Sequence, residues 1–311
     1  MTSKNRNLGF LVGAVAAAAF ACLSFGTQSA QSAPTVATGG AARMYPGIAP
    51  DQIEELAPGD RIKAVTAQRN SASAIWETLE QGEKVECLDC IPSVEPLMYD
   101  ADPRTREIAA WWLRRRIFGV FGPGEVYERT VAKLASDPNP RTRAHAAEAL
   151  GEFLLAPGID AVAGAIERDA DPTVRAAAAG ALGRLNDDGK GALAKALGDA
   201  DVRVKLAALG SATKVNTFSD QAAVAKLLGD GEAKVRRRAA EVLGAMGAKD
   251  ASAGLVGLAK SDPDADVRNA ACHALGALRD PNARAVLEDL SKSDPDPLVR
   301  SQAQIALRRL L

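Results

Sequence analysis

One short phrase recurs along this sequence: an acidic turn, an arginine, and then small apolar residues at helical spacing. A clear copy runs Asp171…Arg175…Ala178…Ala181-Leu182-Gly183. The arginines of seven copies lie 37, 32, 28, 33, 32 and 32 residues apart. These anchor residues are Arg106, Arg143, Arg175, Arg203, Arg236, Arg268 and Arg300. Near-equal steps with matched neighbours identify an internal repeat, which limits the fold to stacks of one small unit.

Each copy of the phrase predicts two helices. The second helix begins at the acidic turn, because Asp accepts the free N–H groups of a first turn and Pro is tolerated there. Apolar residues three, six and seven positions after the arginine then form one helical face. The first helices are predicted at Glu125–Ala135, Ile159–Glu167, Gly191–Leu197, Ser219–Leu228, Ser252–Lys260 and Asn282–Leu290. Since one hairpin cannot bury its faces alone, we predict an all-α fold, an α-solenoid of about seven stacked hairpins.

Acidic residues also repeat, six and four positions before the arginine, as in Asp169/Asp171 and Asp262/Asp264. A ladder of carboxylates could hold metal ions or carry acid–base chemistry. It could instead cap the helices and pair with the arginines of neighbouring turns. The second interpretation is favoured, because a catalytic site needs one copy and the pattern is present in nearly every unit.

The N-terminal region has the pattern of an export signal. Lys4 and Arg6 precede an uncharged stretch, Leu8–Ala21, which is short for a transmembrane helix and is followed by small residues. We therefore predict a signal peptide at residues 1–33, a flexible linker at 34–59, a capping segment at 60–91 and the repeat array at 92–311. The expected location is the periplasm or cell envelope. Membrane contact would come only through an uncleaved N-terminus or through a lipid on Cys22.

The repeat motif Val174-Arg175-x-x-Ala178-x-x-Ala181-Leu182-Gly183 resembles HEAT-like repeats of the short kind found in phycobilisome (bilin) lyases and in deoxyhypusine hydroxylase. The resemblance covers about residues 92 to 311 and implies the solenoid fold. Two units depart from the pattern. The fourth is one residue short between Arg203 and Gly210, and the first ends in Leu113-Arg114 rather than in Leu-Gly.

The resemblance to deoxyhypusine hydroxylase implies an iron site made of His-Glu pairs, which this chain lacks. Its two histidines, His145 and His273, are each followed by alanine, and we expect both on helix surfaces. Resemblance to bilin lyases implies a cytosolic reaction, which conflicts with export. We therefore predict no enzyme activity, no catalytic residues, no metal, no cofactor and no small-molecule substrate.

Cys87-Leu88-Asp89-Cys90 is the one motif outside the repeat. A disulfide between Cys87 and Cys90 is expected in an oxidising compartment. A thiol–disulfide role, a zinc site and a haem attachment are weaker alternatives, since Ile91 replaces the histidine that haem needs and no second cysteine pair exists. Cys272 lies on an apolar helix face and is predicted to be buried.

Charge and aromatic content bear on the partner. A net charge of −1 argues against nucleic-acid binding. Aromatic residues are only 4% of the chain, yet six lie between Tyr99 and Tyr127, in the first unit. A partner-binding face is predicted on this unit at Ile108, Trp111, Arg114, Arg115 and Arg116.

These aromatic residues could instead pack beneath the capping segment around Trp76, where Ser71–Gln81 has a helical pattern. The sequence favours an exported, non-catalytic scaffold that binds another protein. The alternative is an enzyme or enzyme subunit, either of the repeat-lyase type or a thiol–disulfide partner that acts through Cys87 and Cys90.

Overall fold

The computed structural model describes residues 59–69, 71–85, 87–116, 118–119, 122–154 and 156–310. The predicted signal peptide, and the predicted linker up to Gly59, lie outside the described residues. The elements before the second unit are α2 (Gly59–Gln68), α3 (Ala72–Gln81), η2 (Leu88–Cys90), α4 (Ile91–Val94), η3 (Glu95–Tyr99), α5 (Pro103–Arg114) and a small antiparallel pair, β1 (Phe118–Gly119) with β2 (Gly122–Pro123).

The remaining units alternate two kinds of helix. The first helices, with their 3-10 extensions, are α6 (Glu125–Ser136), α8 (Pro157–Arg168), α10 (Ala192–Leu197), α12 (Gln221–Lys226), η4 (Leu227–Gly229), η5 (Lys249–Ala251), α14 (Ser252–Ser261), η6 (Pro281–Ala283) and α16 (Arg284–Ser293). The second helices are α7 (Pro140–Phe153), α9 (Pro172–Leu185), α11 (Val202–Ala212), α13 (Ala233–Ala245), α15 (Ala265–Leu278) and α17 (Pro297–Arg309).

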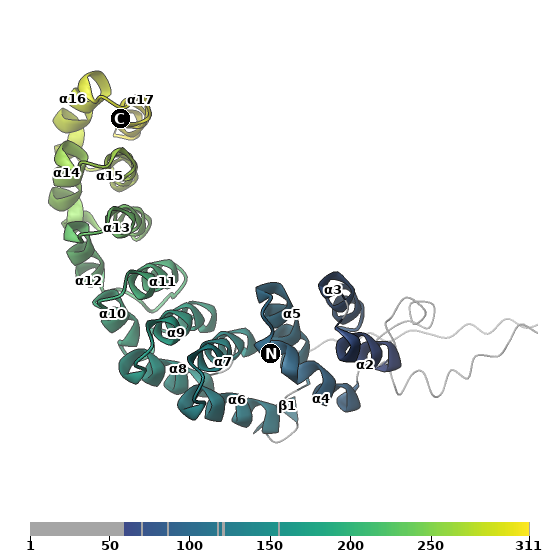
Figure 1. Cartoon of the computed structure of the whole chain (residues 1–311). Coiled ribbons are helices and arrows are strands. Elements are labelled where there is room, and N and C mark those ends of the chain that lie inside the picture. Colours follow the sequence, from purple (N-terminus) through teal and green to yellow (C-terminus); the bar gives the residue numbers. More distant parts are fainter. Residues whose placement is uncertain are drawn as a thin grey trace, which may run out of the picture.

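Helical hairpins stack side by side into a curved array (Figure 1). The second helices, from α7 to α17, form the inner, concave row, and the helices from α6 to α16 form the outer row. With the pair made by α4/η3 and α5, the described residues contain seven such hairpins. The predicted all-α solenoid is confirmed.

Acidic or amide residues start the inner helices as expected. The N-cap side chain of Asp171 accepts a hydrogen bond from the N–H of Thr173 at 2.7 Å, and that of Asp102 accepts from Thr105 at 2.7 Å. Four of the inner helices, α5, α7, α9 and α17, have proline as their first residue. Predicted outer helices agree within a few residues, except that α12 stops at Lys226 because the chain tightens into η4.

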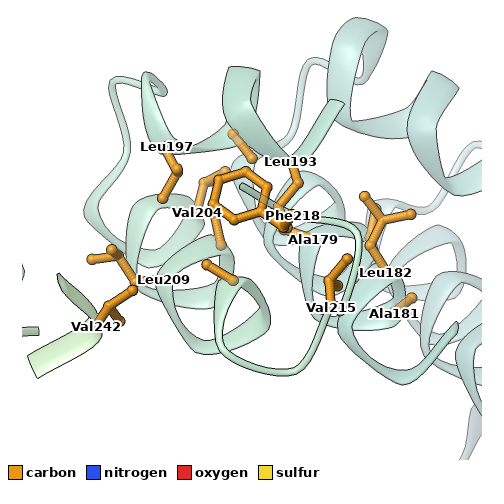
Figure 2. Close-up of a cluster of buried hydrophobic side chains, with 14 of the residues drawn as sticks. Ala179, Ala181, Leu182, Leu193, Leu197, Val204, Leu209, Val215, Phe218 and Val242 are labelled. Atoms are coloured by element: carbon orange, nitrogen blue, oxygen red, sulfur yellow. The ribbon is translucent and has the colours of Figure 1, made fainter. Parts of the chain in front are cut away.

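Small residues let neighbouring inner helices approach closely. A Cβ atom added at Gly151, Gly244 or Gly276 would lie 2.8–3.0 Å from the Cα atom of an alanine on the next inner helix. The recurring Leu-Gly phrase therefore has a packing cause: the leucine fills the core and the glycine makes room for the next repeat. Figure 2 shows this core in the middle of the array, where Leu182, Leu193 and Leu197 lie among alanines and valines.

The capping segment forms an additional hairpin at the start of the row. Helix α3 lies beside α5, and α2 contacts α4, so the pair continues the arrangement of the repeats. Its apolar residues Ile62, Ile75 and Leu79 are buried. The helix predicted over Ser71–Gln81 is present as α3, with Ser71 as its N-cap.

Candidate interaction surface

Anchor arginines join most of the hairpins to the next one. Nε and Nη2 of Arg143 donate to the carboxylate of Asp169 at 2.7 and 2.8 Å, and Nη1 donates to the carbonyl of Asp137 in its own turn at 2.8 Å. The same two-sided arrangement occurs at Arg175–Asp199, Arg236–Asp262 and Arg268–Asp294. These aspartates are 2–12% exposed, so the pairs are shielded from water.

Each of these aspartates also fixes the start of its own helix. Oδ1 of Asp169 accepts from the N–H of Asp171 at 2.9 Å, and Oδ1 of Asp294 accepts from the N–H of Asp296 at 2.8 Å. Hydrogen bonds from Arg143 and Arg268 lower the pKa values of Asp169 and Asp294. The carboxylates stay ionised and serve two neighbouring repeats at once.

Arg203, predicted as the fourth anchor, does not occupy the anchor position. Its guanidinium pairs with Asp201 in its own turn at 2.9 Å, and its side chain is 60% exposed. Lys205 lies four residues after the N-cap Asp201, as every other anchor does relative to its N-cap, and its Nζ lies 2.5 Å from Asp230. The prediction chose Arg203 because it is an arginine, although Lys205 has the equivalent position in the helix. The fourth unit was counted as one residue short for this reason.

The two ends of the array alter the anchor contacts. Arg106 pairs with Glu148 of α7 at 2.8 Å instead of with the next acidic turn. The hydrogen bonds of Arg300 run to the carbonyls of Asp294 and Pro295, within its own turn.

The first unit uses its aromatic residues chiefly to hold the capping hairpin. Trp112 is fully buried, and its Nε1 donates to the carbonyl of Gly82 at 3.0 Å. Arg116 lies 3.6 Å over the Trp112 ring and donates to the carbonyls of Gly82 and Glu83. Trp76 of α3 donates to the hydroxyl of Thr105 at 2.9 Å. These contacts favour the packing alternative for this region.

The partner-binding face predicted on α5 is therefore corrected. Ile108 is buried, Arg116 is engaged with the capping hairpin, and Arg114 contacts the carbonyl of Glu152. Trp111 is half-buried and lines a groove of about 370 Å³, and Arg115 is 53% exposed in a pair with Glu83. The five residues do not form one exposed face, because α3 covers the side of α5 on which several of them lie.

The two histidines have different surroundings. His273 is exposed, as predicted, but His145 is 7% exposed and lines a small cavity with Arg106, Glu148 and Arg184. Burial, and then the positive charge of Arg106, lower the pKa of His145. Its expected surface position was wrong, because α5 and η3 pack over this part of α7.

Cys87 and Cys90 are joined by a disulfide, with 2.02 Å between the sulfur atoms. It closes the loop between α3 and α4, and Cys90 is fully buried while Cys87 is half-buried. Cys272 has a free thiol and is fully buried, and burial raises its pKa to about 12.

Nine residues after the N-cap, α5 and each inner helix carry a residue that is half-buried or exposed, and these inner helices form the concave row of the array. This position holds Trp111, Glu148, Gly180, Gly210, Glu241, His273 and Ile305. A Cβ atom added at Gly180 or Gly210 would meet no atom within 4 Å, so neither glycine makes room for a neighbouring repeat. Both lie inside helices, where glycine costs about 1 kcal/mol relative to alanine.

These glycines sit in an apolar strip on α9 and α11. We call the strip the concave trough; its members are Ala176, Ala177, Gly180, Leu206, Ala207 and Gly210, and all are half-buried. Charged side chains flank it, with Glu148 on α7 and Arg238 and Glu241 on α13. The sequence analysis missed this strip because it took Arg203 as the fourth anchor. In that register Ala208, and not Gly210, is the residue equivalent to Gly180.

Among the described residues, no group of three His, Cys, Asp or Glu side chains is placed to hold a metal ion. No helix in that part of the chain has the length and apolar content needed to span a bilayer.

Comparison with known proteins agrees with the repeat architecture. Residues 159–229 and 221–308 match the family model of HEAT repeats. The structure is similar to that of YibA from E. coli, with a TM-score of 0.55, 19% identity, and coverage of 83% of this chain and 95% of that one. It is also similar to Kap121p bound to Pho4p, with a TM-score of 0.59, 14% identity, and coverage of 81% and 33%.

Human deoxyhypusine hydroxylase, in complex with glycerol, aligns at 19% identity over 81% of this chain and 96% of that one, with a TM-score of 0.36. The sequence has no significant match among curated proteins. The matching family model identifies residues 159–308 as HEAT repeats, and the anchor contacts and stacked hairpins continue the same architecture back to α5.

Proposed function

We propose that this protein is a non-catalytic scaffold that holds another protein against its concave surface, with the concave trough at the centre of the contact. One observation carries the proposal: Gly180 and Gly210 weaken their helices, yet neither one relieves a contact within the array. Removing side chains from this surface lets a partner approach the inner helices closely. HEAT repeats commonly bind proteins, and Kap121p, a structural neighbour, is bound to Pho4p.

The test fills the trough without disturbing the array. Gly180→Leu and Gly210→Leu place a side chain into open space, and Gly257→Leu on α14 does the same on the outer row. We expect that a partner captured by the unmodified protein is lost with the two trough variants and retained with Gly257→Leu. Equal capture by all three folded variants would show that the trough is not the binding surface.

The thiol–disulfide alternative can be separated from the scaffold by the variant Cys87→Ser/Cys90→Ser. A scaffold that binds through the trough should capture its partner equally well without the cysteine pair. Loss of capture in a folded double variant would favour a partner that reacts with Cys87 and Cys90.

We also propose that the protein is exported to the periplasm or cell envelope. The charged start at Lys4 and Arg6 and the apolar stretch Leu8–Ala21 support this proposal. N-terminal sequencing of the envelope form should give a first residue between about Ser29 and Ala37, as the small residues of a cleavage site require. A soluble cytosolic protein that keeps Met1 would contradict export.

A further inference from the structure

The contacts that join successive repeats are altered at one place inside the array, between α11 and α13. We propose that this junction is a flexible joint between two stiffer blocks, α7–α11 and α13–α17. Movement there would change the curvature of the concave surface. The inference goes beyond the proposed scaffold function, because it concerns how the array moves and not what it binds.

The first alteration is the loss of the packing glycine. Gly151, Gly183, Gly244 and Gly276 occupy the position twelve residues after the N-cap, and each is buried under the next inner helix. The equivalent residue of α11 is Thr213, which is exposed. Helix α13 therefore leaves this end of α11 uncovered. Helix α11 is also shorter, since it ends at Ala212.

Larger side chains replace small ones at the same junction. The residue eight positions after the N-cap is alanine in α7, α9 and α13 but Leu209 in α11. The residue ten positions after the N-cap is Ala181, Ala274 or Ala306 in regular helices and Val242 in α13. Figure 2 shows Leu209 and Val242 at the side of the cluster where α11 meets α13. Helix α13 contacts α11 over less of its length than it contacts α15.

The anchor contact is also weaker at this junction. At the four regular junctions, those made by Arg143, Arg175, Arg236 and Arg268, the arginine forms two hydrogen bonds to the next turn and holds its own turn by a third. Lys205 provides one ammonium group, which lies 2.5 Å from Asp230. An ammonium on a flexible stem lacks the planar fork that fixes the angle between guanidinium and carboxylate.

The junction between α5 and α7 provides a contrast. It also lacks the packing glycine, because Arg114 stands at that position. There, however, Arg106 donates both to Glu148 of α7 and to the carbonyl of Asp100 in its own turn. Arg114 also reaches the carbonyl of Glu152 on α7. Loss of both the glycine and the arginine contact is therefore particular to the junction between α11 and α13.

Distance distributions between pairs of spin labels can test the joint. Thr173, Lys234 and Leu298 are exposed and lie two residues after the N-caps of α9, α13 and α17. Labels at Thr173→Cys and Lys234→Cys span two junctions, one of them the joint. Labels at Lys234→Cys and Leu298→Cys span two regular junctions and form the matched control. Cys272→Ala removes the buried free thiol, at a position where α7, α9 and α13 carry alanine.

We expect the distance distribution of the Thr173/Lys234 pair to be wider than that of the Lys234/Leu298 pair. The variant Lys205→Arg/Thr213→Gly restores the regular anchor and glycine and should narrow the first distribution while leaving the second unchanged. Equal widths in the two pairs would overturn the proposal. A wide first distribution that the restored variant does not narrow would also overturn it, because the altered contacts would then not cause the movement.

Discussion

At the scale of single residues, glycine has two opposite roles in this chain. Gly183 is buried where a Cβ atom would lie 2.9 Å from the Cβ of Ser211, whereas Gly180, three residues earlier, faces open space. The same residue type therefore serves packing at one position of α9 and leaves a bare surface one turn earlier. Only the position relative to the N-cap separates the two classes.

Substitution by alanine should distinguish these two roles. Gly180→Ala and Gly210→Ala should each raise the free energy of unfolding by about 0.5–1 kcal/mol, because alanine is the better helix former and meets nothing. Gly276→Ala should lower it, since the new Cβ would lie 2.8 Å from the Cα of Ala306. Chemical denaturation of the three variants measures the differences, and destabilisation by Gly180→Ala would contradict the open position of that glycine.

Thiol counting tests the cysteine assignment. Alkylation of the unreduced, folded protein should leave Cys87 and Cys90 unmodified, because they are joined. Cys272 should react only after denaturation, since its thiol is fully buried. Alkylation of both Cys87 and Cys90 in the unreduced, folded protein would rule out a structural disulfide.

At the scale of elements, one guanidinium makes several of the contacts that hold the capping hairpin. Arg116 joins the end of α5 to the segment that follows α3, through the carbonyls of Gly82 and Glu83 and the ring of Trp112. The carbonyl of Gly82 also accepts from the N–H of Val85 and from Nε1 of Trp112, and Arg116 adds a charged donor to it and to the carbonyl of Glu83, just past the end of α3.

Arg116→Ala should loosen the capping hairpin and leave the remaining array folded. The carbonyl of Glu83 loses a charged donor and must find another donor or be exposed to water, which costs about 1–3 kcal/mol, while the carbonyl of Gly82 keeps its bonds from Val85 and Trp112. Hydrogen exchange of α2 and α3 should therefore accelerate while that of α15 stays unchanged. Arg115→Ala is the control, because Arg115 is 53% exposed and its pair with Glu83 lies near the surface. An equal effect of the two variants would contradict the role of Arg116.

The aspartates between repeats should make the array sensitive to acid. Hydrogen bonds from arginine lower the pKa values of Asp169, Asp199 and Asp294 in the folded protein. Their stabilising contribution is therefore present above the unfolded-state pKa of about 3.9 and is lost as the pH falls through the lower folded-state values. The free energy of unfolding should decline below about pH 4.

Asp294→Asn should flatten part of this acid-dependent decline, because the variant has one fewer carboxylate to protonate. Denaturation curves at several pH values, compared with those of the unmodified protein, measure the effect. Asp250→Asn, on an exposed residue of η5, should leave the pH dependence as it is. If the free energy of unfolding of Asp294→Asn falls with pH as steeply as that of the unmodified protein, Asp294 does not contribute to the acid sensitivity.

The sequence predicted the elements better than the contacts between them. Acidic turns, proline and apolar spacing are local signals, and they located the inner helices and the general use of the anchor residues. Lys205 was not recognised as an anchor because it is a lysine and the pattern expected an arginine. The same error kept Gly210 from being recognised as the equivalent of Gly180. Burial of Ile108 and His145 depends on how α3, η3 and α5 pack over their neighbours, which no local pattern encodes.

At the scale of the whole molecule, each repeat contacts chiefly the repeats beside it. Such an array lacks a single central core, and a local defect acts on its neighbours first. Its stability is then approximately a sum over units and the junctions between them.

Leu182→Ala should show this local behaviour. The side chain of Leu182 is fully buried in the middle of the array, so truncation should cost about 2–5 kcal/mol. Hydrogen exchange should accelerate most in α7, α9 and α11 and least in α17. Leu298→Ala is the control, because Leu298 is 68% exposed and its loss should change little. A uniform acceleration along the chain would indicate one cooperative unit.

The anchor contacts show that each regular junction is encoded half in one repeat and half in the next: the arginine and the glycine come from one unit, and the aspartate and the small residue come from its successor. A gene duplication or deletion whose two ends fall at the same point of two regular units therefore leaves each anchor arginine with an aspartate partner in the following unit. Excision of residues 236–267, from one anchor up to the next, would join Val235 to Arg268 and keep Asp294 as the partner of that arginine. An array of this kind can change length in evolution by whole units without any compensating change elsewhere.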